Sequence, residues 1–257
     1  MPTILFVGDS ITVGLVGSPM KFGFRGPFAK LASFRVGSVI TGYEAVGPFV
    51  DPTGLKHGGI GGASMNTYLG GAGQFAVLSA DAKAKGVQTW LERFKPNFVH
   101  IMLGTNDLIS KRPIKAIADD YQTLLNAAHA IAPATKILVG SIPEVGPLHT
   151  VEYNALLRER VAAGTLGPGT SFVDTSQKIN EVFHKEGSAA IAVDGTHPNQ
   201  RGYDLMGVFL AQTIAGAKPV SPVASGGSAS SSITPANVFW AGAAAYAGYK
   251  LFKWWSP

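Results

Sequence analysis

Short runs of apolar residues alternate along the chain with longer segments in which apolar positions recur every three or four residues. The short runs are typical of buried strands, and the longer segments are typical of helices with one apolar face. The predicted strands are Thr3–Val7, Phe34–Ile40, Phe98–Leu103, Lys136–Ile142 and Ser171–Val173. The predicted helices are Gly26–Ser33, Ala82–Phe94, Pro113–Ile131, Thr150–Ala163, Ser176–Lys185 and Gln200–Ala215.

This alternation predicts an α/β fold in which helices cross over between parallel strands. We therefore expect a five-stranded parallel sheet with helices on both faces. In such sheets reactive side chains gather at the carboxyl ends of the strands, so the residues that follow each strand are the candidates for chemistry.

Composition narrows the possible functions. With 257 residues, 46% of them hydrophobic, the chain is long enough for one domain with a full core and an appendage. It has no cysteine, which excludes disulfides, thiolate metal sites and cysteine nucleophiles. The net charge is +5, but no run of five or more basic residues occurs, so no nucleic-acid partner is predicted. No cofactor and no metal are predicted either.

The composition changes abruptly near Gly216, and we expect one folded domain at 1–216, a Pro/Ser/Gly linker at 217–232 and an apolar helix at 233–257. The last segment carries tryptophans and lysines near its ends, as membrane-anchored or partner-docking helices do. It predicts docking to a membrane, an oligomer or a particle, and the alternative is a tail folded back on its own domain. No amino-terminal signal peptide is recognisable, so the compartment stays open, with a phage particle as one hypothesis.

Ser10 follows the first predicted strand directly. A serine hydroxyl is a poor nucleophile, and it needs a general base, a carboxylate that orients the base, and donors for the oxyanion. His197 and Asp194 lie three positions apart in a predicted tight loop, and they are the candidate base and orienting acid. Asp174, which also follows a strand, is the rival for the acid. Asp9 is expected to hold the loop.

The candidate oxyanion donors are the backbone N–H groups of Ser10 and Gly62 and the side-chain amide of Asn106. Gly62 lies in a stretch, HGGIGGASM, that also contains Gly58, Gly59 and Gly61, so a neighbouring glycine is an alternative donor. For Asn106 the alternative is a turn cap, and Asp107 is a candidate cap of the following helix.

The other histidines have no acidic residue in a matching context. We expect them to be surface or packed residues; they are His57, His100, His129, His149 and His184.

Four stretches, GDSIT, the glycine-rich HGGIGGASM, GTND and DGTHPN, resemble the four blocks of the SGNH, or GDSL, hydrolase superfamily in their usual order. The resemblance covers about residues 3–215. It implies a flavodoxin-like, three-layer α/β/α fold, and it implies an enzyme that hydrolyses an ester or, less often, a thioester or amide. The residues that name the superfamily fall here on Ser10, Gly62, Asn106 and His197.

A narrower likeness runs through FRGPFAKL, FRVGS and HGGIGGASM, which are similar to the acetylxylan esterase-like branch of carbohydrate esterases. The chain departs from that branch at two positions. Phe24 precedes Arg25 where the branch has a tyrosine before its arginine, and Gly58 stands where the branch usually has a glutamate. The likeness implies a Ser-His-Asp esterase acting on acetyl groups of an acylated small molecule or polysaccharide. The alternatives are a lipolytic esterase or lysophospholipase, and a non-catalytic glycan-binding or structural module.

Overall fold

The structure, a computed structural model, describes residues 2–18, 21–32, 35–36, 39–40, 43–69, 80–144, 149–190 and 192–216. The chain separates into two units, Met1–Ala215 and Gly216–Pro257. The predicted linker at 217–232 and the predicted apolar helix at 233–257, with its expected docking role, lie outside the described residues. Among the helices that the structure describes, none is long and apolar enough to cross a membrane.

Within the described residues, a sheet of 7 strands forms the middle of the first unit. Its strands are β1 (Thr3–Gly8), β4 (Glu44–Val46), β5 (Phe49–Val50), β6 (Lys56–Gly59), β7 (Phe98–Met102), β8 (Lys136–Gly140) and β9 (Thr170–Val173). Their order is β5-β6-β1-β7-β8-β9, and β4 pairs with the first half of β1. β5 is antiparallel to β6, and the other pairs are parallel. The order β6-β1-β7-β8-β9 is that of flavodoxin-like sheets.

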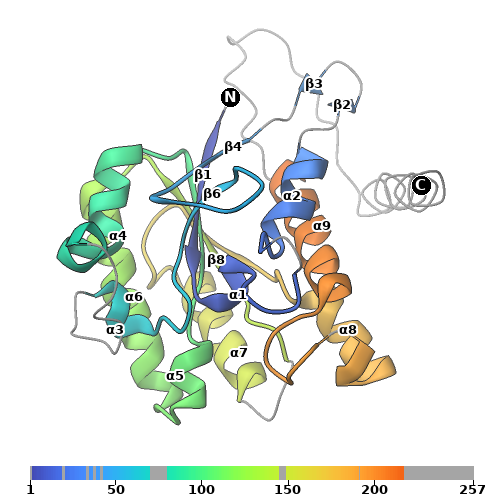
Figure 1. The fold of residues 1–257 in the computed structure, drawn as a ribbon. Coiled ribbons are helices and arrows are strands. Elements are labelled where there is room, and N and C mark those ends of the chain that lie inside the picture. The colour runs from blue at the N-terminus through green and yellow to red at the C-terminus, as the bar shows by residue number, and fades with distance from the viewer. Residues whose placement is uncertain are drawn as a thin grey trace, which may run out of the picture. The chain divides into compact units, whose positions relative to one another are not determined.

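Helices cover both faces of this sheet (Figure 1), with α4 and α6 on one side and α2 and α9 on the other. The described helices are α1 (Ser10–Val13), α2 (Arg25–Ala32), α3 (Met65–Tyr68), α4 (Ala80–Phe94), α5 (Thr105–Ile109), α6 (Ile114–Ile131), α7 (Thr150–Ala162), α8 (Gln177–Glu186) and α9 (Gln200–Gly216), with a 3₁₀ turn at Ser188–Ala190. The predicted three-layer α/β fold is therefore confirmed.

Burial on both faces explains the unbroken apolar run of β1 at the centre of the sheet. Ile4, Leu5, Phe6 and Val7 of β1 are each at most 1% exposed, because a strand covered on both faces needs an unbroken apolar run. On one side of the sheet, α9 packs closely on α2, since a β-carbon on Gly207 would collide with the backbone of α2. This contact brings the loop before α9 close to the segment that joins β1 to α2.

The predicted helices are present, each within two residues of its expected ends. The prediction of five parallel strands is wrong. The described part of the run Phe34–Ile40 forms β2 (Arg35–Val36) and β3 (Val39–Ile40), which pair antiparallel with each other outside the main sheet. β4 and β6 lie beside β1 instead. Their short sequences, EAV and KHGG, contain no apolar run to reveal them.

Candidate active site

Ser10 lies where β1 ends and α1 begins. The Asp9 side chain caps this short helix, because its Oδ1 accepts the Ile11 N–H at 2.9 Å. Gly8 makes the sharp turn possible, since a β-carbon there would collide with the Thr12 hydroxyl. The Ser10 hydroxyl is partly buried, and the Ser10 N–H, as the first of a helix, has no acceptor within that helix.

Arg25, at the start of α2, holds the other end of α1 and is almost completely buried. Its Nε donates to the Thr12 carbonyl oxygen at 2.8 Å, and its Nη2 donates to the Val13 carbonyl oxygen at 3.1 Å. The carboxylate of Asp51, equally buried, lies 3.0 Å from Arg25 Nη1. Burial lowers the pKa of Arg25 to about 10, so the group stays a cation near neutral pH. The helix that begins with Ser10 is thus tied down at both ends.

His197 lies beside Ser10 although 187 positions separate them. Nε2 of its ring is 2.8 Å from Ser10 Oγ, and Nδ1 is 2.7 Å from Asp194 Oδ2. The three side chains form a continuous row from hydroxyl to carboxylate. In such a row an imidazole can exchange a proton with the hydroxyl while the carboxylate keeps the ring oriented.

The loop that carries Asp194 and His197 holds itself in shape. Oδ1 of Asp194 accepts the N–H groups of Thr196 at 3.0 Å and His197 at 2.8 Å. The Val193 N–H donates to the His197 carbonyl oxygen at 3.0 Å. Gly195 adopts a φ of 77°, which glycine reaches without steric cost. Hydrogen bonds within a few residues therefore orient both side chains.

Asp194 is suited to stabilise an imidazolium. Partial burial raises its pKa, but the hydrogen bonds from the His197 N–H, the His197 ring and the Thr196 N–H outweigh that effect, and the net pKa is lowered. Its side chain is 47% exposed and that of His197 is 19% exposed. This end of the row is therefore open to solvent, which screens the interaction between the carboxylate and the imidazolium.

The segment after α1 packs directly on the His197 loop. Gly17 has a φ of 76°, and a β-carbon there would collide with the Pro198 carbonyl oxygen and lie 3.0 Å from Asn199 Cα. Only glycine allows the two backbones to approach this closely. This contact helps to keep Ser10 and His197 within reach of each other.

The glycine-rich stretch is divided between a strand and a turn. Gly58 and Gly59 belong to β6, and the Gly59 N–H donates to Nδ1 of His57 at 3.1 Å. Gly61 and Gly62 lie in the turn after β6, and Gly62 adopts a left-handed φ of 70°. The candidate backbone donors of this stretch are therefore the two turn glycines.

Asn106, in α5 just after β7, reaches the same turn. Its Nδ2 donates to the Ala63 carbonyl oxygen at 2.9 Å. That contact uses one of the two amide hydrogens and leaves the other for a ligand oxygen. The structure thus brings Asn106 and the Gly61–Gly62 turn together at the carboxyl edge of the sheet.

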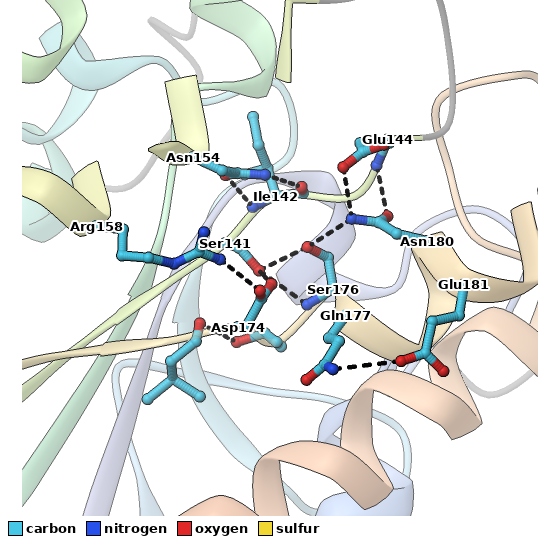
Figure 2. A network of polar contacts seen from close by, with 12 residues as sticks. Ser141, Ile142, Glu144, Asn154, Arg158, Asp174, Ser176, Gln177, Asn180 and Glu181 are labelled. Atoms are coloured by element: carbon cyan, nitrogen blue, oxygen red, sulfur yellow. Dashed lines mark hydrogen bonds and ion pairs between the residues drawn. The ribbon is translucent and has the colours of Figure 1, made fainter. Parts of the chain in front are cut away.

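Asp174, the rival for the orienting acid, has other partners. Figure 2 shows its carboxylate between Ser141 and Arg158, with contacts of 2.7 Å from Ser141 Oγ and 2.6 Å from Arg158 Nη2. Ser141 Oγ also lies 2.6 Å from Ser176 Oγ. This network joins the ends of β8 and β9 to α7, whereas the His197 ring faces Asp194.

The remaining histidines have partners of their own. His57 and His100 are buried, and burial lowers the pKa of each to about 3. The other three have polar partners: His129 contacts Thr170, His149 contacts Glu152, and His184 contacts Glu144. In the described part of the chain, no group of three or more His, Asp or Glu side chains is placed to hold a metal ion.

Both departures from the acetylxylan esterase-like pattern point into the core. Phe24 is fully buried, and its ring packs edge-to-face near Phe6 and His100. A β-carbon on Gly58 would lie 2.6 Å from the Trp90 ring, so Trp90 fills the space that a longer side chain would need. These two changes alter packing beneath the candidate site.

Two supports of the site are not predicted from the sequence. Arg25 lies inside an apolar stretch, which is a signal of a buried ion pair beside its place in the branch likeness. The contact of Gly17 with Pro198 has no local signal, because it depends on how distant segments pack.

A family model described as GDSL-like Lipase/Acylhydrolase matches residues 6–205. A multidomain esterase from Ruminococcus flavefaciens is 23% identical over 234 residues, which are 83% of this chain and 28% of that esterase. The chain thus spans little more than a quarter of the length of that relative.

Solved carbohydrate esterases share the fold. A family 3 carbohydrate esterase from Clostridium thermocellum has a TM-score of 0.63 at 21% identity, with 83% of this chain and 96% of that chain covered. One from Talaromyces cellulolyticus has a TM-score of 0.60 at 20% identity, with 84% and 98% covered. An acetylxylan esterase from Geobacillus stearothermophilus has a TM-score of 0.58 at 20% identity, with 83% and 94% covered. The resemblance expected from the sequence motifs is confirmed.

Proposed function

Because the chain belongs to the GDSL-like lipase/acylhydrolase family, we propose that it is a serine ester hydrolase whose nucleophile is Ser10. One observation carries the assignment of residues. The row from Ser10 Oγ through the His197 ring to Asp194 has contacts of 2.8 and 2.7 Å, which are hydrogen-bond distances. This arrangement supplies the base and the orienting carboxylate that a serine nucleophile needs.

In the first half of the reaction, His197 Nε2 takes the proton of Ser10 while Ser10 Oγ bonds to the ester carbonyl carbon. Asp194 holds Nδ1 of the ring as an N–H and stabilises the imidazolium. The bond from carbon to the alcohol oxygen then breaks, and His197 gives its proton to the leaving alcohol. Ser10 is left as an acyl ester. Water then bonds to the acyl carbon while His197 Nε2 takes a proton from it, the bond from that carbon to Ser10 Oγ breaks, and His197 returns the proton to Oγ as the carboxylic acid leaves.

The negative charge on the carbonyl oxygen needs donors in place before it develops. We assign this role to the N–H groups of Ser10 and Gly62 and to the free hydrogen of the Asn106 amide. The left-handed turn at Gly62 and the contact from Asn106 to Ala63 support this assignment, because both lie in one turn beside the end of β1.

For the substrate, we propose small acyl esters, acetyl above all, on a carbohydrate. Support comes from the relatives described as carbohydrate esterases and as an acetylxylan esterase. The identity of the alcohol is open to direct measurement. Acetate released from a panel of acetylated xylans, pectins and bacterial polysaccharides would identify it.

A lipolytic activity is the second candidate, because apolar side chains are exposed near the site. Leu15 and Val16 follow the Gly14 cap of α1, and Val193 directly precedes Asp194; each is more than a third exposed. Such side chains could pack on a longer acyl chain. Hydrolysis of p-nitrophenyl esters of increasing length separates the two candidates: a maximum at acetyl supports the first, and a strong preference for eight carbons or more would replace it with the second.

Replacing Ser10 tests the mechanism. Ser10→Ala should lower kcat on the order of 10³-fold or more and abolish labelling by a fluorophosphonate, since both need the nucleophile. Ser110→Ala, at an exposed serine after α5, is the matched control and should keep full activity and labelling. A wild-type protein that resists the label while it binds polysaccharide would instead support a non-catalytic glycan-binding module.

A further inference from the structure

Asp107 lies next to Asn106 in α5, and its side chain is fully buried. Its Oδ2 accepts the N–H of Met65, the first residue of α3, at 3.0 Å. Its Oδ1 accepts a hydrogen bond from Arg112 Nη1 at 2.5 Å. The carboxylate thus joins α5 to the chain just after the glycine turn, although the sequence suggested only a cap for its own helix.

Asn106 and Asp107 hold the segment that follows the Gly61–Gly62 turn at two points. Asn106 binds the Ala63 carbonyl oxygen, and Asp107 binds the Met65 N–H two residues further on. Gly62 lies immediately before the first of these contacts. Because the backbone from Ala63 to Met65 is fixed at both ends, the direction of the peptide that carries the Gly62 N–H depends on both side chains.

Arg112 supplies the charge that a buried carboxylate requires. Its Nη2 lies 2.7 Å from Asp120 Oδ2 in α6, and its N–H donates to the Asp107 carbonyl oxygen at 3.0 Å. The hydrogen bonds to Asp120 and Asp107 raise the pKa of Arg112. α6 therefore anchors Arg112, Arg112 anchors Asp107, and Asp107 anchors the turn.

We propose that Asp107 is a positioning residue for the Gly61–Gly62 turn, which carries one of the proposed oxyanion donors. It fixes the Ala63–Met65 backbone so that the Gly62 N–H and the Asn106 amide face the developing negative charge. This inference rests on the proposed esterase function. Donors stabilise a transition state only when they are held within a fraction of an ångström of the required position, and a buried, charge-paired carboxylate provides that rigidity.

The test compares Asp107→Asn with Asp119→Asn, a control that removes exposed ion pairs from α6. Active sites are counted by the burst of p-nitrophenol, so that kcat refers to folded, reactive protein only. We expect kcat per active site to fall roughly 10- to 100-fold in Asp107→Asn, less than for loss of a donor itself, with KM changed less than about threefold. A merely structural role would lower the number of active sites and leave kcat per site unchanged.

A double-mutant cycle with Asn106→Ala adds a second readout. If both side chains act on the same oxyanion donors, Asp107→Asn should cost much less in the Asn106→Ala background than in the wild type. Should Asp107→Asn fail to fold, Arg112→Met, which leaves Asp107 in place but unpaired, is measured in the same way. In that variant we expect a similar selective fall in kcat per active site.

The outcomes separate this inference from the function on which it rests. If Ser10→Ala is inactive but Asp107→Asn keeps wild-type kcat per site, or its effect adds fully to that of Asn106→Ala, the positioning role is refuted and the esterase stands. If Ser10→Ala keeps its activity, the proposed function itself fails.

Discussion

The two halves of the candidate site are ordered by different means. The His197 half is a loop open to solvent, held by hydrogen bonds between residues two to four positions apart, such as Asp194 to Thr196. The proposed oxyanion half is partly buried, with Met65 and Asp107 beneath it fully buried, and it is held by α5, more than 40 positions away along the chain. The first half can therefore be recognised from a short stretch of sequence, whereas the second is completed only by packing.

The largest expected effect on activity comes from a substitution in the His197 half. Asp194→Asn should lower kcat/KM roughly 10²- to 10⁴-fold, because the amide no longer holds Nδ1 as the donor and cannot stabilise the imidazolium. The matched control is Asp174→Asn, at the carboxylate that pairs with Ser141 and Arg158. Steady-state kinetics should find the control within about threefold of wild type; a larger loss in the control than in Asp194→Asn would reverse the assignment of the acid.

A smaller effect is expected where the segment after Ser10 meets the His197 loop. Gly17→Ala adds a β-carbon that collides with the Pro198 carbonyl oxygen and places alanine at a φ of 76°. The control, Gly164→Ala, carries the same backbone penalty at a φ of 71° but meets nothing within 4 Å. Both variants should lose about 1 kcal/mol or more of unfolding free energy from the backbone alone.

Only Gly17→Ala should also displace His197 from Ser10, and its kcat should fall at least about tenfold. Urea unfolding and steady-state kinetics on both variants separate the two contributions. Equal activity in the two would mean that the contact with Pro198 does not hold the halves together.

The smallest expected effect is the pH dependence of stability, set by buried groups beneath the site. Burial lowers the pKa of His57 and His100 to about 3, so below pH 6.5 the unfolded chain binds protons that the folded chain does not. Because of these two histidines, the free energy of unfolding decreases as pH falls below 6.5. Burial raises the pKa of Asp9 to about 6, against the lowering effect of its Ile11 hydrogen bond. As pH falls, Asp9 therefore takes up a proton in the folded chain before it does so in the unfolded chain, and this uptake increases the free energy of unfolding.

Between pH 6 and 5 the net difference is about one proton, so unfolding free energy should fall by about 1.4 kcal/mol per pH unit on acidification. Asp9→Asn removes the opposing term and should steepen the slope toward about two protons. Urea unfolding at pH 5, 5.5 and 6 measures both slopes. An unchanged slope in the variant would show that Asp9 does not titrate in this range.

The apolar pattern predicted the layer order and the long helices, because their burial is written into the sequence as periodicity. It failed beside β1, because the described part of the run Phe34–Ile40 forms β2 and β3 outside the main sheet. β6 takes that place with the sequence KHGG. Glycines suit this strand because Trp90 packs against it at Gly58 and α1 packs against it at Gly59, on the opposite face, a condition that no local pattern expresses.

The sequence by itself determined the chemistry on offer: a serine after the first strand, a histidine with an acid three positions before it, and an asparagine after a central strand. These features are local, and strand ends in a parallel sheet meet at one edge whatever the connections. Only the tertiary structure decided that Asp174 turns to Ser141 and Arg158, which glycines form the turn, and how Arg25 and Asp107 hold the two backbones. Those choices depend on contacts between segments far apart in sequence, and such contacts form only when the helices pack on the sheet.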